Sequence, residues 1–92
     1  MTGKRFVEPP ASAPAHWELP DISAMQALER GDATSDQQKR ALAWMINNAC
    51  GTYDADYRVN ERDHAFVSGR RFVGLQIVKL LKLSIGKLKK EQ

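Results

Sequence analysis

Apolar residues recur every three or four positions in three segments of the chain, which is the spacing of amphipathic helices. The first candidate helix follows Pro20, with Asp21 as its N-terminal cap and Gly31 as its stop. Its apolar side consists of Ile22, Met25 and Leu28. A helix this short is marginal on its own, so its stability must come from packing.

The second candidate helix has stronger signals at both ends. Two capping boxes fit its start, Ser35 with Gln38 or Thr34 with Gln37, and Gly51 ends it. One apolar face contains Leu42, Met45, Ile46 and Ala49. The pattern therefore predicts a helix over about residues 35–50.

The third candidate helix begins near Asn60, a suitable cap, and extends to about Lys89. One broad apolar face contains Phe66, Val73, Ile77, Leu80, Leu81, Ser84 and Leu88, and the opposite arc contains Arg71, Lys79, Lys82, Lys89 and Lys90. Such a helix is about 44 Å long, whereas a compact domain of this size has a radius of gyration of about 12 Å. Either the helix breaks near Gly69, Gly74 or Gly86, or its C-terminal half needs a partner or an oligomer.

Three further apolar side chains lie on the side of this helix that should face water, namely Phe72, Leu75 and Leu83. They are interleaved with Lys79 and Lys82, which is typical of a second contact surface. The alternative is that a bend at Gly74 turns some of them inward.

All four prolines lie within the first 20 residues, where they disfavour helix. The chain is therefore predicted to be all-α, with an extended arm over residues 1–20 and one small three-helix domain over residues 21–92. The arm is either a disordered tail or a segment held in a groove by its apolar side chains, which are Phe6, Val7, Trp17 and Leu19.

Trp44 lies on the far side of the second helix, about 200° around from Leu42. Either the N-terminal arm partly buries this indole, or the indole contacts another molecule. The predicted partner-binding residues are Trp17, Leu19, Trp44, Phe72, Leu75 and Leu83.

Charge is unevenly distributed, although the net charge of the 92 residues is only +3. Residues 1–69 contain seven basic and ten acidic side chains, whereas residues 70–92 contain seven basic side chains and only Glu91 as an acid. This basic C-terminus makes nucleic-acid binding through phosphate contacts the alternative function, with Arg71, Lys79, Lys82, Lys87, Lys89 and Lys90 as the contacts. No helix-turn-helix pair is evident, so base-specific recognition is not supported.

Cysteine and histidine usage argues against a disulfide or metal protein. The single Cys50 excludes an intrachain disulfide and favours an intracellular or virion setting. Cys50, His16 and His64 lack metal-site spacing, and the loop with Asp54 and Asp56 lacks the glycine and distal glutamate of a calcium loop. We expect Asx turns in that loop, flanked by two packed tyrosines, Tyr53 and Tyr57.

No catalytic residue, cofactor or metal is predicted, because nothing places a nucleophile beside a base. The sequence has no apolar segment of about 18 residues, so it contains no candidate membrane span. Peripheral membrane binding by the basic amphipathic segment from Leu75 to Lys90 would require its apolar face to be free. We therefore expect no membrane partner.

The most informative segment is residues 66–75, Phe-Val-Ser-Gly-Arg-Arg-Phe-Val-Gly-Leu. Each of its two glycines costs about 1 kcal/mol in a helix, and close approach of another backbone is the usual compensation. Arg70 projects toward the apolar face and requires a carboxylate, for which Asp54 and Asp56 are candidates. Arg70 either clamps the helix to the loop or, together with Arg71, recognises a phosphate or a partner carboxylate.

This segment resembles the Phe-x-x-Gly-Arg-Arg-x-Val-Gly-Leu signature of a small domain family of tailed bacteriophages, whose genes tend to lie among head-assembly genes. The resemblance covers roughly Ser35 to Leu83, and the matching positions are Gly69, Arg70, Arg71 and Gly74. It implies a non-enzymatic assembly protein in the virion or host cytoplasm, whose partners are capsid, portal or tail components. It assigns no catalytic residue, so Gly69, Arg70 and Gly74 are predicted to be structural.

Overall fold

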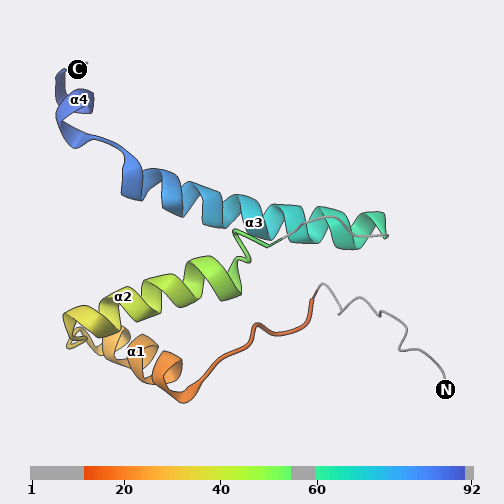
Figure 1. The fold of residues 1–92 in the computed structure, drawn as a ribbon, viewed down its shortest axis with the longest axis horizontal. Helices are drawn as coiled ribbons and strands as arrows, with labels where there is room; N and C mark the ends of the chain where they lie inside the picture. Colours follow the sequence, from red (N-terminus) through yellow and green to blue (C-terminus); the bar gives the residue numbers. More distant parts are fainter. Residues whose placement is uncertain (1–11, 55–59, 91–92) are drawn as a thin grey trace.

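A computed structural model describes residues 12–54 and 60–90, with the Lys90 side chain excluded. Over these residues the protein is all-α, as predicted, and contains no strand (Figure 1). The elements are α1 (Leu19–Arg30), α2 (Ser35–Trp44), a π-helical turn η1 (Met45–Ala49), α3 (Glu61–Lys82) and α4 (Ile85–Lys90). Phe6, Val7, Asp56, Tyr57 and Glu91, which entered the predictions above, lie outside the described residues.

Helix α1 begins earlier than predicted, at Leu19, so Pro20 occupies its first turn. Asp21 is not the cap. It is the third helical residue of a capping box, and its carboxylate accepts a hydrogen bond from the Glu18 backbone N–H at 2.9 Å. The predicted stop is confirmed, because Gly31 is left-handed with φ +80° and donates to the carbonyls that end the helix.

Helix α2 uses the second of the two predicted capping boxes. Thr34 Oγ1 accepts from the Gln37 backbone N–H at 3.1 Å, and the Gln37 side chain accepts from the Thr34 backbone N–H at 2.9 Å. The box of Ser35 with Gln38 is wrong, because Ser35 is already helical. The helix then widens into η1, where the Cys50 N–H donates to the Met45 carbonyl.

Helices α1 and α2 form an antiparallel hairpin (Figure 1). Small residues make most of its interface. Ala24, Ala27 and Ala41 are almost completely buried. The prediction that α1 packs through Ile22, Met25 and Leu28 is therefore only partly correct. Ile22 and Met25 are half-buried, and Leu28 is exposed. The interface consists of alanines because the two helices approach closely and leave no room for larger side chains.

Helix α3 begins as predicted, with the Asn60 side chain accepting from the backbone N–H groups of Arg62 and Asp63. It ends at Lys82 and does not continue to Lys89, and of the three predicted break positions Gly86 is the one beside the break. The chain becomes extended at Leu83 and resumes as the short helix α4. The break shortens the helix to 22 residues, or about 33 Å. It is still longer than the part of the domain that packs against it.

That support is narrow, because among the described helices α3 packs against η1 alone. The hairpin of α1 and α2 diverges from the C-terminal half of α3, and α4 lies beyond it (Figure 1). Val67 and Gly74 are the buried residues of α3. The apolar core of the described residues is correspondingly small and consists of Ala24, Ala27, Ala41, Ile46 and Val67.

Candidate functional site

The centre of α3 sits directly on the loop that follows η1. A Cβ placed on Gly74 would overlap the Thr52 hydroxyl and would lie 2.9 Å from Cys50 Cβ. Thr52 is completely buried, and both its hydroxyl and its backbone N–H donate to the Ile46 carbonyl, at 2.7 and 3.1 Å. Gly74 is therefore one of the two close-approach positions that the sequence indicated, and Thr52 is its counterpart. Close approach is not found at the other, since a Cβ on Gly69 would meet no described atom within 4 Å.

The two arginines of the motif both face this loop. Arg71 Nε donates to the Thr52 carbonyl at 2.9 Å, so this member of the basic arc contacts the loop and is half-buried. Arg70 lies against Gly51, because a Cβ on Gly51 would be 3.0 Å from Arg70 Nη2. Together the arginines and Gly74 hold α3 on residues 51 and 52, and we call this arrangement the helix–loop clamp.

The predicted ion pair of Arg70 is not formed with Asp54, although both side chains lie close to Gly51. Within the described residues, the buried Arg70 Nε has no hydrogen-bond partner. Tyr53 is also exposed and does not pack beside the loop as predicted. Thr52 was missed by the sequence analysis, and its position just after a helix-ending glycine was the available signal.

Much of the apolar face of α3 that was expected to be buried is exposed, although Ile77 on this face is half-buried. Phe66, Val73 and Leu80 are 50%, 51% and 72% exposed, and they repeat every seven residues along one line of the helix. We call these three residues the side stripe. They lie about 100° around the helix from Gly74, so the helix–loop clamp does not cover them.

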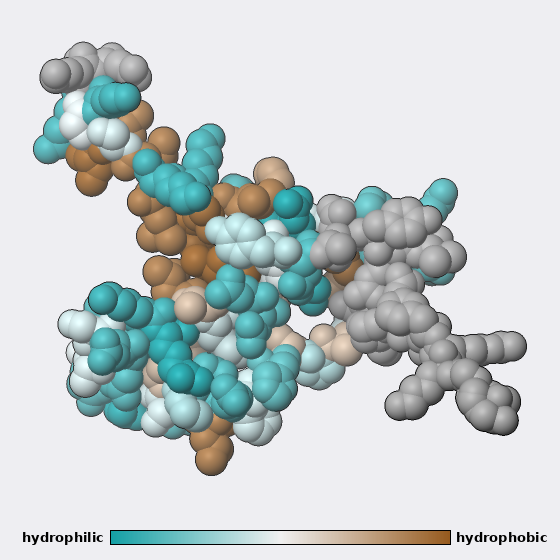
Figure 2. All heavy atoms as spheres, viewed as in Figure 1, coloured by the Kyte–Doolittle hydropathy of each residue, from teal (hydrophilic) through white to brown (hydrophobic). Residues whose placement is uncertain are grey.

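A second apolar surface lies on the side of α3 opposite Gly74, where the sequence analysis placed contact residues. Phe72, Leu75 and Leu83 are 61%, 39% and 41% exposed and border an open hollow of about 510 Å³ with Gln76, Lys79 and Leu80. Figure 2 shows apolar side chains gathered over the C-terminal half of α3. No bend at Gly74 turns these residues inward, because α3 is continuous through it.

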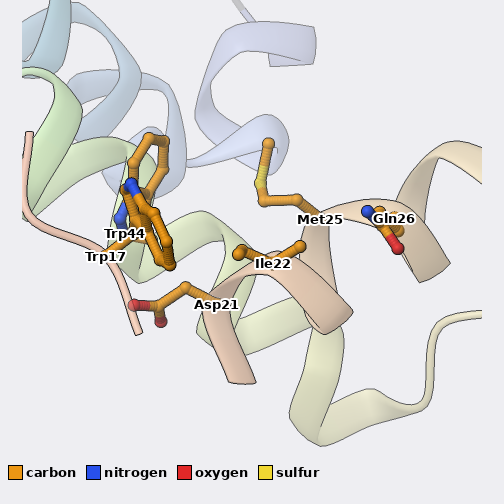
Figure 3. A pocket seen from close by; sticks show the side chains of 6 residues that line it. All are labelled: Trp17, Asp21, Ile22, Met25, Gln26 and Trp44. Atoms are coloured by element: carbon orange, nitrogen blue, oxygen red, sulfur yellow. The ribbon is translucent and has the colours of Figure 1, made fainter. Parts of the chain in front are cut away.

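The indoles of Trp17 and Trp44 come together at one end of a small apolar pocket on α1 (Figure 3). Its volume is about 290 Å³, and Ile22 and Met25 supply the rest of its apolar lining. Trp44 Nε1 and Asn48 Nδ2 both donate to the His16 carbonyl, each at 3.0 Å. The residues preceding α1 therefore partly cover Trp44, which confirms the first of the two explanations for it.

Leu19 is separate from this pocket. It is 76% exposed and lines an open hollow with Pro20 and Arg40 on another side of α1. Trp17 and Leu19, both predicted to anchor the arm, therefore belong to two separate small surfaces.

An ion-pair network joins the start of α1 to α2. Arg40 Nε donates to the Asp21 carboxylate at 2.8 Å, and Arg40 Nη2 lies 3.4 Å from Glu18. The hydrogen bond from the Glu18 backbone N–H is the main reason that the pKa of Asp21 lies below its ordinary value. Burial opposes this shift, and the Arg40 guanidinium adds to it.

Asp21→Asn is expected to lower the melting temperature at neutral pH and to have little effect in strong acid. The carboxylate pKa is lower in the folded chain than its ordinary value of 3.8, so ionised Asp21 stabilises the fold above that value. This stabilisation is lost as the pH falls through the folded-state pKa. Thermal unfolding of both proteins across this range checks the prediction, and a difference that does not change with pH would contradict it.

The predicted phosphate contacts now divide into two groups. Lys79, Lys82, Lys87 and Lys89 are exposed, whereas Arg71 is held by the helix–loop clamp. The Lys90 side chain lies outside the described residues. Among the described residues, the predicted phosphate contacts that remain available therefore lie in the last turn of α3 and in α4.

No metal-binding cluster is present among the described residues, which contain no group of three neighbouring His, Cys, Asp or Glu side chains. None of the described helices has the length and apolar character needed to cross a membrane. Comparison with family models, curated proteins and solved structures found no match to this chain.

Proposed function

We propose that this chain is a small, non-enzymatic assembly protein of a tailed bacteriophage that docks onto a larger structural protein of the particle. The phage assignment is supported by the resemblance of residues 66–75 to the family signature. The docking role is supported by the exposed apolar side chains of α3 and of the residues before α1.

The observation that carries the proposal is the exposed side stripe of Phe66, Val73 and Leu80. An amphipathic helix normally buries such a stripe against its own domain. Here the domain contacts α3 on a different side, through the helix–loop clamp. The side stripe is therefore available to a groove or helix on another protein, the mode in which apolar anchors repeat along one helix face.

The side stripe contributes part of the free energy that docking requires. Removing a large apolar side chain from water contributes roughly 1–2 kcal/mol when half of it is already covered. The three residues of the side stripe together supply several kcal/mol before the entropic costs of association. The pocket beside Trp17 and Trp44 offers a second anchor point, since tryptophan is enriched among residues that dominate interfaces.

Val73→Glu tests the proposal. The variant is expected to fold like the wild type, because changes at exposed positions usually alter stability by less than about 0.5 kcal/mol. A buried, unpaired carboxylate in the interface should nevertheless reduce association by more than about tenfold. The measurement is the amount of tagged chain that co-purifies with phage particles on a density gradient, quantified by mass spectrometry.

Ser35→Glu is the matched control, since it adds the same charge at an exposed position at the start of α2 that lines none of the hollows described above. It should leave the chain on the particles. Absence of the wild-type chain from purified particles, or full retention of Val73→Glu, would reject the docking role. Loss of the chain from empty, nuclease-treated particles but not from DNA-filled ones would show that DNA, and not a structural protein, is the partner.

A further inference from the structure

The exposed side of α3 follows a heptad spacing. Gly69, Gln76 and the C-terminal cap Leu83 alternate with the three residues of the side stripe, so that successive positions are three and then four residues apart. We call this line the seam, and it consists of Phe66, Gly69, Val73, Gln76, Leu80 and Leu83. All six residues are exposed and none is charged. Alternating steps of three and four residues are the spacing by which one helix packs along another in a coiled coil.

The rest of the described chain contacts α3 on other sides. At about 100° per residue the seam lies within an arc of about 100°, and its centre is about 130° around the helix from Gly74. A Cβ on Gly69 would meet no heavy atom of the described residues within 4 Å. Leu80 and Leu83 also border the open hollow beside Phe72. A molecule that lies along the seam would therefore cover this edge of the hollow as well.

A helix fits the seam better than a lipid surface does. A bilayer selects a broad apolar arc and gains nothing from a glycine or an amide in the middle of it, whereas Gly69 and Gln76 both lie within the seam. In a pair of helices, a polar residue at one seam position specifies the register. Glycine weakens a helix but lets another backbone approach closely, so a partner helix gives both residues a role.

The charge around the C-terminal half of the seam is positive. No acidic residue occurs between His64 and Lys90. Lys79 lies at the edge of the seam, about 40° around the helix from Leu83, and it forms no ion pair with another described residue. The exposed Lys82 and the exposed lysines of α4 add to the positive potential at this end.

Acidic residues on the partner helix would complement this potential. A second copy of the chain is the poorer match, because residues 66–83 offer no acid opposite Lys79 in either orientation. We infer that the seam binds a helix of the partner protein that carries apolar residues at heptad spacing with acidic residues beside them. This inference rests on the proposed function, because it names the chemistry of the partner that covers the side stripe.

The test uses two synthetic peptides of three heptads each, with leucine at the two apolar positions of every heptad. One peptide has glutamate at the two flanking positions and the other has lysine, so like charges keep each peptide from pairing with itself. Fluorescence anisotropy of each labelled peptide is measured against the full purified chain at low salt. The wild type should bind the glutamate peptide at micromolar concentrations and the lysine peptide severalfold more weakly, with the difference shrinking as salt is added.

Two neighbouring leucines provide matched variants. Leu80→Ala should weaken binding of the glutamate peptide about tenfold, because it removes an apolar side chain from the seam. Leu81→Ala makes the same exchange at the next residue, which is also exposed but lies on another side of α3, and it should change binding less than about twofold. Lys79→Glu should narrow the difference between the two peptides, because it reverses the charge at the edge of the seam.

Failure of the wild type to bind the glutamate peptide, equal binding of both peptides, or equal losses in Leu80→Ala and Leu81→Ala would overturn the inference. Binding to anionic phosphatidylglycerol vesicles but to neither peptide would assign the seam to a lipid surface instead. Self-association that Leu80→Ala abolishes, with no peptide binding, would assign it to a second copy. These measurements need no phage particle, so a chain that binds the glutamate peptide but is absent from particles would refute the docking role alone.

Discussion

Gly74→Ala is expected to lower the free energy of unfolding by about 2 kcal/mol, although alanine is the better helix former. The added methyl group would occupy the position of the Thr52 hydroxyl, which is buried and hydrogen-bonded to the Ile46 carbonyl. Overpacking of a buried site costs about 1–3 kcal/mol, and loss of a buried hydrogen bond adds about 1 kcal/mol. The gain of about 1 kcal/mol in helix propensity offsets only part of this.

Gly69→Ala is the matched control for this substitution. The same exchange on the same helix meets no atom of the described residues within 4 Å, so it should stabilise the chain by up to about 1 kcal/mol. Urea unfolding followed by circular dichroism measures both variants, at concentrations low enough to keep the chain monomeric. If the two alanine variants shift stability in the same direction, the helix–loop clamp is not the contact described here.

Ile46→Ala should be the most disruptive single truncation and is expected to cost about 2–4 kcal/mol. Ile46 is only 8% exposed, and its carbonyl is the acceptor that fixes Thr52 beneath α3. Val67 is the only other core residue among those described that is larger than alanine, so little else compensates for the lost contacts. Urea unfolding monitored by circular dichroism gives the change in stability directly.

Two further variants calibrate this result. Ile46→Val should cost only about 0.5–1.5 kcal/mol, since it removes one methyl group. Ile85→Ala removes the same atoms as Ile46→Ala from a side chain that is 69% exposed, and it should change stability by less than about 0.5 kcal/mol. Equal losses at positions 46 and 85 would mean that α4 packs on the domain in solution.

Two helix ends were predictable because capping is a local interaction. Asn60 and Gly31 act within three or four residues of their own positions, and their roles were correctly predicted from the residue types. Two adjacent registers of one capping box differ little in local energy, so the choice of Thr34 with Gln37 depended on where α2 packs.

The face by which α3 packs was not predictable from periodicity. Apolar residues occur on most sides of this helix, and the widest stripe of them was expected to be buried. The domain instead contacts the narrow line that contains Val67 and Gly74, because only a glycine there lets the backbone reach Thr52. Close approach to a loop thus outweighed the burial of Phe66, Val73 and Leu80 within the same chain.

The sequence by itself determined the helical class, the cap of α3 at Asn60 and the end of α1 at Gly31. These features depend on interactions between residues that are close along the chain. Tertiary structure alone decided that Gly74 and not Gly69 is the contact glycine, that Arg71 bonds the loop carbonyl, and that two sides of α3 remain uncovered. These outcomes depend on which backbone lies opposite each position, and that distance is set only when distant segments pack together.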